Sequence, residues 1–553
     1  MADTYDVVVL GTGAAGLTAA ITAHDGGARV GVFEKAETVG GTSAWSGGQI
    51  WIPANPHELA LGKQDSREQA LTYLMSLSHG MIDPKMAAAY IDTGPEMIRY
   101  LEERTPVRFY SVPDFPDYHP EFPGGMPKGG RTLECPPFPY GELGAWRDRV
   151  GTSPYYPDFT ITISETTLGQ SVPTPANPEV KAKRKANDER GMGLALIGRL
   201  LRGCLDRGIE PRSQSRAMQL IMKNGAVAGV KFEGARGPFE VRASNVILCT
   251  GGFEWNPDLI RAFTRGPLTH PVSIKTNTGD GLKMAMRVGA MLGNMREAWW
   301  MPVIEVPLEV NSMGRQLLTY ERTMPGTLMI NRHGRRFTNE ASNYNAFGAA
   351  FHEQDVSRFE YANLPCWLIF NQDFYARWPF VGGLSDTFTT AARPPSWIPR
   401  ADSLEELGRQ LGVDSAQLVR TIDRFNQHAR AGHDPDFRRG ESANDIWWGD
   451  PAWRGDKRAT LGPLEKGPYY AVEVKSGALG TKGGPQTNVD AQVLDVDGAP
   501  IPGLYAAGNV MASPMGMTYG GGGGTLGPGM VFGFRAGRAA AASLKRTAAS
   551  SAA

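Results

Sequence analysis

A glycine turn near the start of the chain constrains the fold more than any other feature. An apolar run of strand length, 7–10, leads into Gly11, Gly13 and Gly16, and an alanine-rich segment, 14–23, follows. Glycine suits these positions, because the turn needs unusual dihedral angles and the helix must pack closely on the strand. The sequence therefore predicts a strand, a turn and a helix whose N-terminal N–H groups face a phosphate.

A second apolar run, 30–33, extends this pattern and ends in Glu34. An acid at that point of a strand-helix-strand unit binds a ribose hydroxyl. The glycine pattern alone is a weak signal, but the second strand and its acid make a dinucleotide site the favoured interpretation over a chance glycine turn.

The composition limits the class of protein. A chain of 553 residues exceeds the size of one hydrophobic core, so we expect two or more domains. The 57 basic and 57 acidic residues balance, which removes any electrostatic reason to expect a nucleic acid or an acidic membrane as partner. No apolar run reaches the about 18 residues of a membrane span, and the acidic N-terminus is unlike a signal peptide. Small molecules are the expected partners.

The four cysteines, Cys135, Cys204, Cys249 and Cys366, form no Cys-x-x-Cys pair. We therefore expect buried thiols in a reducing compartment, the cytoplasm, without a disulfide framework. The histidines show no metal-ligand spacing, so no metal site is predicted.

Glycine turns recur at 40–48, Gly251, 279–281 and 503–508. A nicotinamide cofactor that exchanges freely usually needs only the first turn. A large cofactor that is held permanently needs contacts spread over the chain, so FAD is favoured over NAD.

Two long segments interrupt this pattern. Residues 106–190 are largely irregular, with prolines and aromatic residues crowded near their start, and we expect them to form an excursion on the substrate side. Residues 301–464 are aromatic-rich and are predicted to be poor in strands, and we interpret them as an inserted catalytic domain. The FAD-binding domain is then discontinuous, comprising 1–300 and 465–553.

These motifs resemble the FAD-dependent family of fumarate reductases and 3-ketosteroid dehydrogenases over nearly the full length. The matching pieces include Gly11-x-Gly-x-x-Gly16 with Glu34, Gly40-Gly-Thr-Ser43, Thr278-Gly-Asp-Gly281 and Arg336-Phe-x-Asn-Glu340. The resemblance implies an α/β fold in which an α+β catalytic domain is inserted into a Rossmann-like FAD-binding domain.

The resemblance also implies the cofactor contacts. The predicted cofactor-binding residues are Gly11, Gly13, Ala14, Ala15, Gly16, Glu34, Lys35, Gly41, Thr42, Ser43, Gly47, Gly48, Thr250, Gly251, Gly252, Gly279, Asp280, Gly508, Asn509, Thr525 and Leu526. Relatives that attach the flavin covalently carry a histidine in the early glycine loop. Residues 42–45 contain none, so noncovalent FAD is expected.

One position separates the branches of the family. Fumarate-reducing members have an arginine four residues after the glutamate of the Arg-Phe-x-Asn-Glu motif, and this chain has Tyr344 there. A phenol cannot bind a carboxylate bidentately as guanidinium does, so a dicarboxylate substrate is disfavoured. The tyrosine resembles the 3-ketosteroid 1-dehydrogenases, in which it removes a proton from C2 while C1 delivers hydride to flavin N5.

Two further tyrosines complete the expected site. By resemblance, the Tyr519 hydroxyl and the Gly523 N–H hold the 3-keto oxygen of the steroid, and Tyr118 assists the base. The assistant could also be Tyr110 or His119. The run of five glycines, 520–524, predicts a loose loop and leaves the register between Gly521 and Gly524 open.

The predicted function is the dehydrogenation of a 3-ketosteroid at C1–C2, with the electrons passed to an external acceptor. Three alternatives remain: a C4–C5 dehydrogenase of 3-keto-5α-steroids, a flavin-dependent reductase of an activated alkene, and a flavin-holding subunit without steroid activity.

Overall fold

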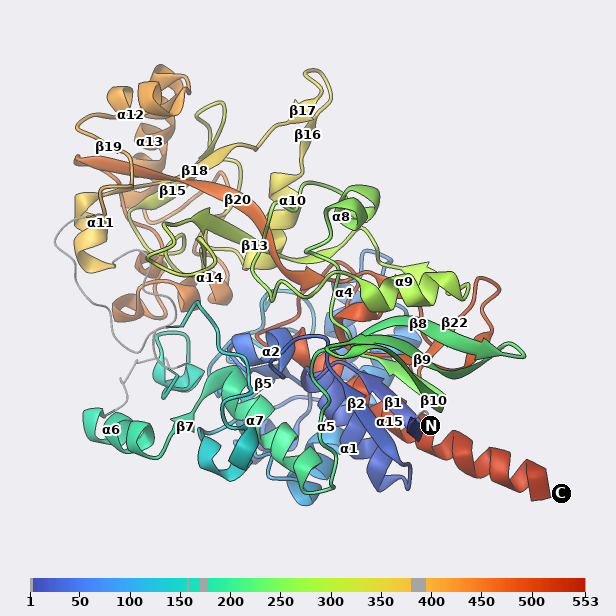
Figure 1. The fold of residues 1–553 in the computed structure, drawn as a ribbon. Coiled ribbons are helices and arrows are strands. Elements are labelled where there is room, and N and C mark those ends of the chain that lie inside the picture. Colours follow the sequence, from blue (N-terminus) through green and yellow to red (C-terminus); the bar gives the residue numbers. More distant parts are fainter. Residues whose placement is uncertain (1–2, 157–158, 170–176, 379–393, 553) are drawn as a thin grey trace.

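The structure is a computed structural model that describes residues 3–156, 159–169, 177–378 and 394–552 (Figure 1). Parts of two predicted segments, 157–158 and 170–176 in the excursion and 379–393 in the expected catalytic domain, lie outside these ranges. Two seven-stranded sheets form the framework. The first lies at the lower right of Figure 1, near both termini, and the second at the upper left.

The first sheet joins the two ends of the chain. Its main path is β2 (Val30–Phe33), β1 (Asp3–Leu10), β10 (Gly237–Leu248), β23 (Pro500–Ala506) and β22 (Gln492–Leu494). The strands from β2 to β23 are parallel, with Leu10 paired to Phe33 and to Leu248. Because these strands are parallel, the turns that follow β1, β2, β10 and β23 meet at the edge formed by their carboxyl ends. Ligands of such sheets bind at this edge. β8 (Ser215–Lys223) forms a hairpin with β9 (Ala226–Gly234), and β9 also pairs with β10.

Helices pack closely on this sheet. Gly533 and Gly537 of α15 (Leu526–Ala552) lie against α1 (Ala14–Asp25), where any Cβ would overlap the carbonyls of Ala15 and Ala19. The remaining α-helices are α2 (Gly41–Trp45), α3 (Pro56–Ala60), α4 (Arg67–Ser76), α5 (Pro84–Arg104), α6 (Pro178–Ala186), α7 (Met192–Leu205), α8 (Pro257–Phe263), α9 (Asp280–Arg287), α10 (Phe347–Phe351), α11 (Gln372–Arg377), α12 (Leu404–Leu411), α13 (Ser415–Arg430) and α14 (Ala443–Trp448). Among the described residues, no helix is long and apolar enough to cross a membrane.

The second sheet corrects the expectation of a strand-poor segment after residue 301. Its path is β14 (Arg315–Leu317), β13 (Ala298–Glu305), β20 (Tyr469–Thr481), β18 (Cys366–Asn371) and β15 (Thr327–Asn331), with β11 (His270–Pro271) and β19 (Arg400–Ala401) beside β20. Five of the six residues of β18 are buried, so this strand lacks the alternation of polar and apolar residues by which strands are usually found.

Two strands of the second sheet extend outside the predicted segment 301–464. β13 crosses the predicted boundary at 300/301, and β20 lies beyond 464 although it pairs with β13 and β18. The partners of each strand are distant in sequence, so their sheet could not be assigned from local patterns.

The excursion 106–190 contains short elements and no long strand among its described residues. Its strands are β4 (Tyr110–Ser111), β5 (Thr132–Glu134), β6 (Phe138–Pro139) and β7 (Glu189–Arg190), with η1 (Tyr140–Trp146) and η2 (Ile163–Glu165). β5 pairs with β4 and with β3 (Ile50–Trp51). The four cysteines are free and buried, as expected.

Candidate active site

One continuous cavity of about 250 Å³ is lined by residues of both sheets and of the excursion. We divide its lining into two parts. The glycine wall is formed by the turns around Gly11, Gly41, Gly251 and Gly508. The tyrosine wall is formed by Tyr118, Tyr344, Tyr519 and Gly523 with their apolar neighbours.

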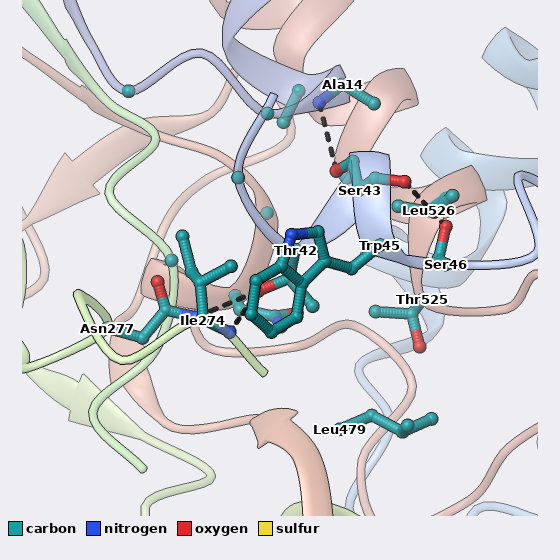
Figure 2. A pocket seen from close by; sticks show the side chains of 18 of the residues that line it. Ala14, Thr42, Ser43, Trp45, Ser46, Ile274, Asn277, Leu479, Thr525 and Leu526 are labelled. Carbon is teal, nitrogen blue, oxygen red and sulfur yellow. Dashed lines mark hydrogen bonds between the residues drawn. The ribbon is translucent and has the colours of Figure 1, made fainter. Parts of the chain in front are cut away.

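The glycine wall brings backbone to the cavity surface. Gly11 has a φ of +107°, and a Cβ there would overlap the carbonyl of Cys249. Figure 2 shows Ser43 beside the start of α1, where its Oγ accepts a hydrogen bond of 3.1 Å from the Ala14 N–H. This hydrogen bond joins the first turn to the start of α2, so both contribute to one surface of the cavity.

The acid after β2 is held by the first turn. Glu34 Oε2 accepts hydrogen bonds from the Thr12 N–H at 3.0 Å and the Thr12 hydroxyl at 2.6 Å. Lys35 Nζ lies 2.9 Å from Asp280, which also pairs with Arg216 at 2.9 Å. Burial alone would raise the pKa of Asp280, but the hydrogen bonds from Arg216 and Lys35 lower it. The α9 turn is thus anchored to the strand that carries Glu34.

A polar cluster that the motifs did not reveal supports Thr42. Asn277 Nδ2 donates to Thr42 Oγ1 at 3.2 Å, a contact drawn in Figure 2, and to Glu254 Oε1 at 2.7 Å. Ser273 donates to the same carboxylate oxygen at 2.5 Å. Burial raises the pKa of Glu254 despite these bonds. Asn277 directly precedes the Thr278-Gly-Asp-Gly motif, and this position is the sequence signal that could have identified it.

Three predicted cofactor-binding residues do not line the cavity. Gly16 lies against Gly11 O, and Gly252 lies between Glu254 and Thr481. Gly279 has a φ of +77° and precedes α9. The close packing and the left-handed conformation explain the glycines at these positions. The other predicted cofactor-binding residues all line the cavity.

Several residues of the cavity lining were missed by the sequence motifs. They share no local pattern and come from separate loops and strands: Thr12, Trp45, Ser46, Gln49, Tyr155, Tyr156, Leu168, Ile274, Asn277, Met301, Leu317, Thr319, Trp448 and Leu479.

The tyrosine wall brings three phenols together. Their ring centroids are 5.4 Å apart for Tyr118 and Tyr344, 5.0 Å for Tyr118 and Tyr519, and 5.5 Å for Tyr344 and Tyr519. The hydroxyls of Tyr118 and Tyr344 are 3.0 Å apart and hydrogen-bonded. The competing residues have other partners, because Tyr110 donates to Glu134 at 2.8 Å and His119 Nε2 bonds to Asn343 at 3.1 Å.

Tyr519 is oriented by the residue that starts the last helix. Thr525 Oγ1 donates to the Tyr519 oxygen at 3.0 Å. The Tyr519 hydroxyl also hydrogen-bonds with that of Tyr344, and because it accepts from Thr525 it can donate its own proton to a neighbouring acceptor. Gly523, with a φ of +96°, lines the same wall, and the described residues provide no acceptor for its N–H.

The glycine loop 520–524 is clamped, contrary to the expected looseness. Gly520 O accepts from the Tyr118 N–H at 2.9 Å and the Tyr73 hydroxyl at 2.7 Å, and Gly522 O accepts from Thr132 at 3.0 Å. A Cβ at Gly521 would overlap the ring of Trp51. The glycines permit close packing, and the packing fixes the loop.

A buried ion network supports both Trp51 and the Tyr118 loop. Arg131 bonds to Asp117 at 2.7 Å and to Asp65 at 2.6 Å, and Trp51 Nε1 donates to Asp117 at 2.7 Å. Burial raises the pKa of Asp117 to about 6. Because Asp117 directly precedes Tyr118, this network fixes the backbone that carries the phenol.

The Arg-Phe-x-Asn-Glu motif forms a second buried network, which does not line the cavity. Arg336 lies 2.8 Å from Glu340 and 2.9 Å from Asp434, and Arg439 lies 3.1 Å from Glu340. These charges fix the chain just before η3 (Tyr344–Ala346), so the motif positions Tyr344.

Burial governs the ionisation of the three phenols. It raises the pKa of Tyr344 and of Tyr118 well above 10, and it also raises that of Tyr519. The hydrogen bond to Tyr344 and the positive charge of Arg322 act in the opposite direction on Tyr118. On Tyr344 the hydrogen bonds with Tyr118 and Tyr519 raise the pKa further, so the interactions that favour a phenolate act on Tyr118.

The remainder of the tyrosine wall is apolar and aromatic, comprising Tyr155, Tyr156, Leu168, Met301, Leu317, Trp448 and Leu479. Among the described residues that line the cavity, the cationic side chain is that of Lys35, which is already paired with Asp280.

Comparisons with known proteins agree over the whole chain. The profile described as "FAD binding domain" matches residues 6–526. The chain is 40% identical over 551 residues to the 4-oxocyclohexanecarboxylate 2-dehydrogenase of Sinomonas cyclohexanicum, covering 97% of this chain and 92% of that protein. It is 38% identical over 567 residues to the 3-oxosteroid 1-dehydrogenase of Mycobacterium tuberculosis (strain ATCC 25618 / H37Rv), covering 96% of this chain and 97% of that protein.

A solved structure gives a similar result. The 3-ketosteroid delta1-dehydrogenase from Sterolibacterium denitrificans, in complex with 1,4-androstadiene-3,17-dione, is 34% identical and superposes with a TM-score of 0.87. The alignment covers 98% of this chain and 100% of that one.

Proposed function

The chain belongs to the FAD binding domain family, and from this premise we propose that it is an FAD-dependent dehydrogenase that introduces a C1–C2 double bond into 3-ketosteroids. The comparisons confirm three predictions: the resemblance to this family, the cofactor FAD, and the class of oxidoreductases that act on CH–CH groups. The observation that supports the steroid reaction best is the cluster of Tyr118, Tyr344 and Tyr519 in an otherwise apolar wall.

The glycine wall fits FAD. At Gly11 and Gly13 the cavity surface is bare backbone at the start of α1, where a pyrophosphate binds favourably. Ser43, Gly508 and Asn509 extend the same wall, and Glu34 would bind a ribose hydroxyl. When bound, FAD supplies the two-electron acceptor for the oxidation. We propose noncovalent binding, because residues 42–45 contain no histidine.

Tyr519 and Gly523 polarise the substrate carbonyl in this proposal. Thr525 donates to the Tyr519 oxygen, so the Tyr519 O–H can donate to a ketone. The Gly523 N–H is the second donor. Two donors aimed at one oxygen acidify the adjacent C–H bond, because they stabilise the negative charge that develops on that oxygen.

Tyr344 is the base that removes the proton from C2, and Tyr118 is the partner through which the proton leaves. The 3.0 Å hydrogen bond between their hydroxyls provides the path. Because burial raises the pKa of both phenols, the phenolate needs stabilisation. Arg322 provides a positive charge whose field lowers the pKa of Tyr118.

The choice of substrate rests on the apolar part of the wall. A steroid skeleton gains affinity by leaving water, and Leu168, Met301 and Trp448 offer the surface to receive it. An external acceptor must then take up the electrons.

A monocyclic keto acid is the second candidate, because the 40% identical relative is named for 4-oxocyclohexanecarboxylate. The same tyrosines would serve its ketone. However, the described lining of the tyrosine wall contains no lysine or arginine to bind its carboxylate, which favours the steroid.

We further propose that the second sheet is the core of an inserted catalytic domain. The strands of the first sheet come from both ends of the chain, and most of the second sheet lies between them in sequence. Tyr344 belongs to this insertion and Tyr519 to the C-terminal segment, so the active site would lie where the two parts meet.

Steady-state kinetics with both substrates tests the proposal. We expect a higher kcat/KM for 4-androstene-3,17-dione than for 4-oxocyclohexanecarboxylate, and NMR of the product should locate the new double bond at C1–C2. A preference for the keto acid would favour the second candidate. A double bond introduced at C4–C5 of a saturated 3-ketosteroid would reassign the reaction.

A further inference from the structure

We propose that Lys482 is a positioning residue that holds Tyr519 in place, and that this hold requires the positive charge of its ammonium group. The inference rests on the proposed role of Tyr519 as donor to the substrate carbonyl. Lys482 directly follows β20, its side chain is fully buried, and it does not line the cavity that holds the tyrosines.

The first link runs through the backbone. Lys482 Nζ donates to Thr518 O at 2.7 Å and to Met517 O at 3.0 Å. These carbonyls belong to the two residues directly before Tyr519. Asn345, the neighbour of Tyr344, also donates to Met517 O at 3.0 Å. The same peptide group therefore connects the loop of the carbonyl donor to the loop of the base.

The second link runs through an aromatic ring. Lys482 Nζ lies 4.1 Å from the ring centroid of Trp299. The Trp299 ring meets that of Tyr519 edge to face, with centroids 4.8 Å apart and planes at 75°. Trp299 Nε1 donates to Asn509 at 3.0 Å, which fixes the indole. Lys482 thus supports Tyr519 in two ways: it holds the backbone just before Tyr519, and it contacts Trp299, which packs against the Tyr519 ring.

The surroundings explain why the charge matters. No carboxylate of the described residues lies within ion-pair distance of Lys482 Nζ. The charged groups that influence its pKa are Glu297, which pairs with Arg265 at 3.4 Å, and Arg265 itself. Carbonyl dipoles and an aromatic face therefore hold the ammonium, and both interactions weaken when the amine is neutral. Burial lowers the pKa of Lys482 to about 7, so its charge is sensitive to its surroundings.

A double-mutant cycle on the FAD-loaded enzyme tests the proposal. Lys482→Met keeps the length of the side chain and removes the charge, and we expect kcat for 4-androstene-3,17-dione to fall about 10- to 100-fold, the range for a reacting group displaced by 1 Å. In a Tyr519→Phe background, the same substitution should change kcat by less than about twofold, since its effect passes through the Tyr519 hydroxyl. Lys482→Arg should restore part of the loss. Lys475→Met, on the strand that ends directly before Lys482, is the matched control and should leave kcat unchanged.

A spectroscopic readout separates positioning from general destabilisation. The ultraviolet absorption of bound 1,4-androstadiene-3,17-dione should shift to longer wavelength in the wild type, because a hydrogen bond polarises its carbonyl. The shift should shrink in Lys482→Met at unchanged FAD content. If Lys482→Met does not yield folded holoenzyme, Trp299→Leu tests the same coupling to Tyr519.

The outcomes distinguish this inference from the proposed function. An equal loss from Lys482→Met with and without the Tyr519 hydroxyl, or no loss at all, would overturn the role of Lys482. If Tyr519→Phe itself has no effect on kcat or on the absorption shift, the proposed role of Tyr519 is wrong, and the inference about Lys482 is overturned with it.

Discussion

The glycine wall and the tyrosine wall enclose one cavity but are built by opposite means. In the glycine wall, turns at the ends of parallel strands bring bare backbone to the surface, and residues such as Gly11 work because they have no side chain. In the tyrosine wall, the side chains Tyr118, Tyr344 and Tyr519 come from three distant segments and meet by hydrogen bonds and ring contacts.

The difference teaches where each function is vulnerable. A side chain added to the glycine wall disturbs the fold and the cofactor site together, because the backbone itself forms the surface that binds the cofactor. A hydroxyl removed from the tyrosine wall should leave the fold and the cofactor intact and affect only the chemistry.

The largest effect is expected for Gly11→Ala. Its Cβ would overlap the Cys249 carbonyl at a φ of +107°, so we expect no FAD-loaded folded protein. Gly27→Ala is the matched control, because Gly27 has a φ of +98° with open space around it. Backbone strain should lower the free energy of unfolding of this variant by only about 1–2 kcal/mol. Flavin content and thermal unfolding measure both variants. Gly11→Ala with normal flavin content would contradict the role assigned to close packing.

The next effect is expected for Tyr344→Phe. Loss of the base should lower kcat by about 10²- to 10⁴-fold, the usual contribution of general base catalysis, at unchanged FAD content. Tyr375→Phe, a buried tyrosine of α11 outside the cavity, is the control and should keep the wild-type kcat. Turnover within about threefold of wild type in Tyr344→Phe would exclude it as the base.

The pH dependence should come from the tyrosine wall. Because burial raises the pKa of Tyr344 and Tyr118 well above 10, the phenolate fraction is small at neutral pH and grows as pH increases. We expect kcat/KM to rise by about tenfold per pH unit below that pKa. The sign is opposite for stability: neutral buried phenols stabilise the fold at neutral pH, and this contribution is lost as pH rises above about 10. A kcat/KM that is flat with pH would argue against a phenolate base.

A smaller effect is expected for Thr525→Val, which removes the hydroxyl that donates to Tyr519. The loss of one hydrogen bond corresponds to about 0.5–1.5 kcal/mol, or about two- to tenfold in kcat/KM. Thr487→Val is the control, because its buried hydroxyl has no hydrogen-bond partner among the described residues. Equal effects of the two substitutions would show that Thr525 acts through packing rather than through Tyr519.

The two walls also differed in how far the sequence could predict them. Gly11, Gly41 and Gly508 follow strands of local pattern, so their turns could be placed at one sheet edge without a structure. Tyr344 was found because it stands at a fixed distance from the Arg336–Glu340 motif, whose ion network holds it. Such signals are local in sequence, so the residues that they mark could be predicted without a structure.

The remainder depends on contacts that no local pattern carries. β18 is buried along most of its length and so lacks an alternating pattern, and the segment that holds it was predicted to be poor in strands. Trp448 and Tyr156 line the cavity only because distant loops fold together. The looseness expected of loop 520–524 ignored Trp51 and Tyr73, whose packing against those glycines could not be inferred from composition.

Anaerobic mixing of the FAD-loaded enzyme with 4-androstene-3,17-dione is the most direct test that this cavity dehydrogenates a 3-ketosteroid through Tyr344. We expect rapid loss of the yellow flavin colour in the wild type, formation of 1,4-androstadiene-3,17-dione, and the same change slowed by at least about 10²-fold in Tyr344→Phe. Colour that persists with the steroid, or bleaching at equal rates in both proteins, would contradict the assignment.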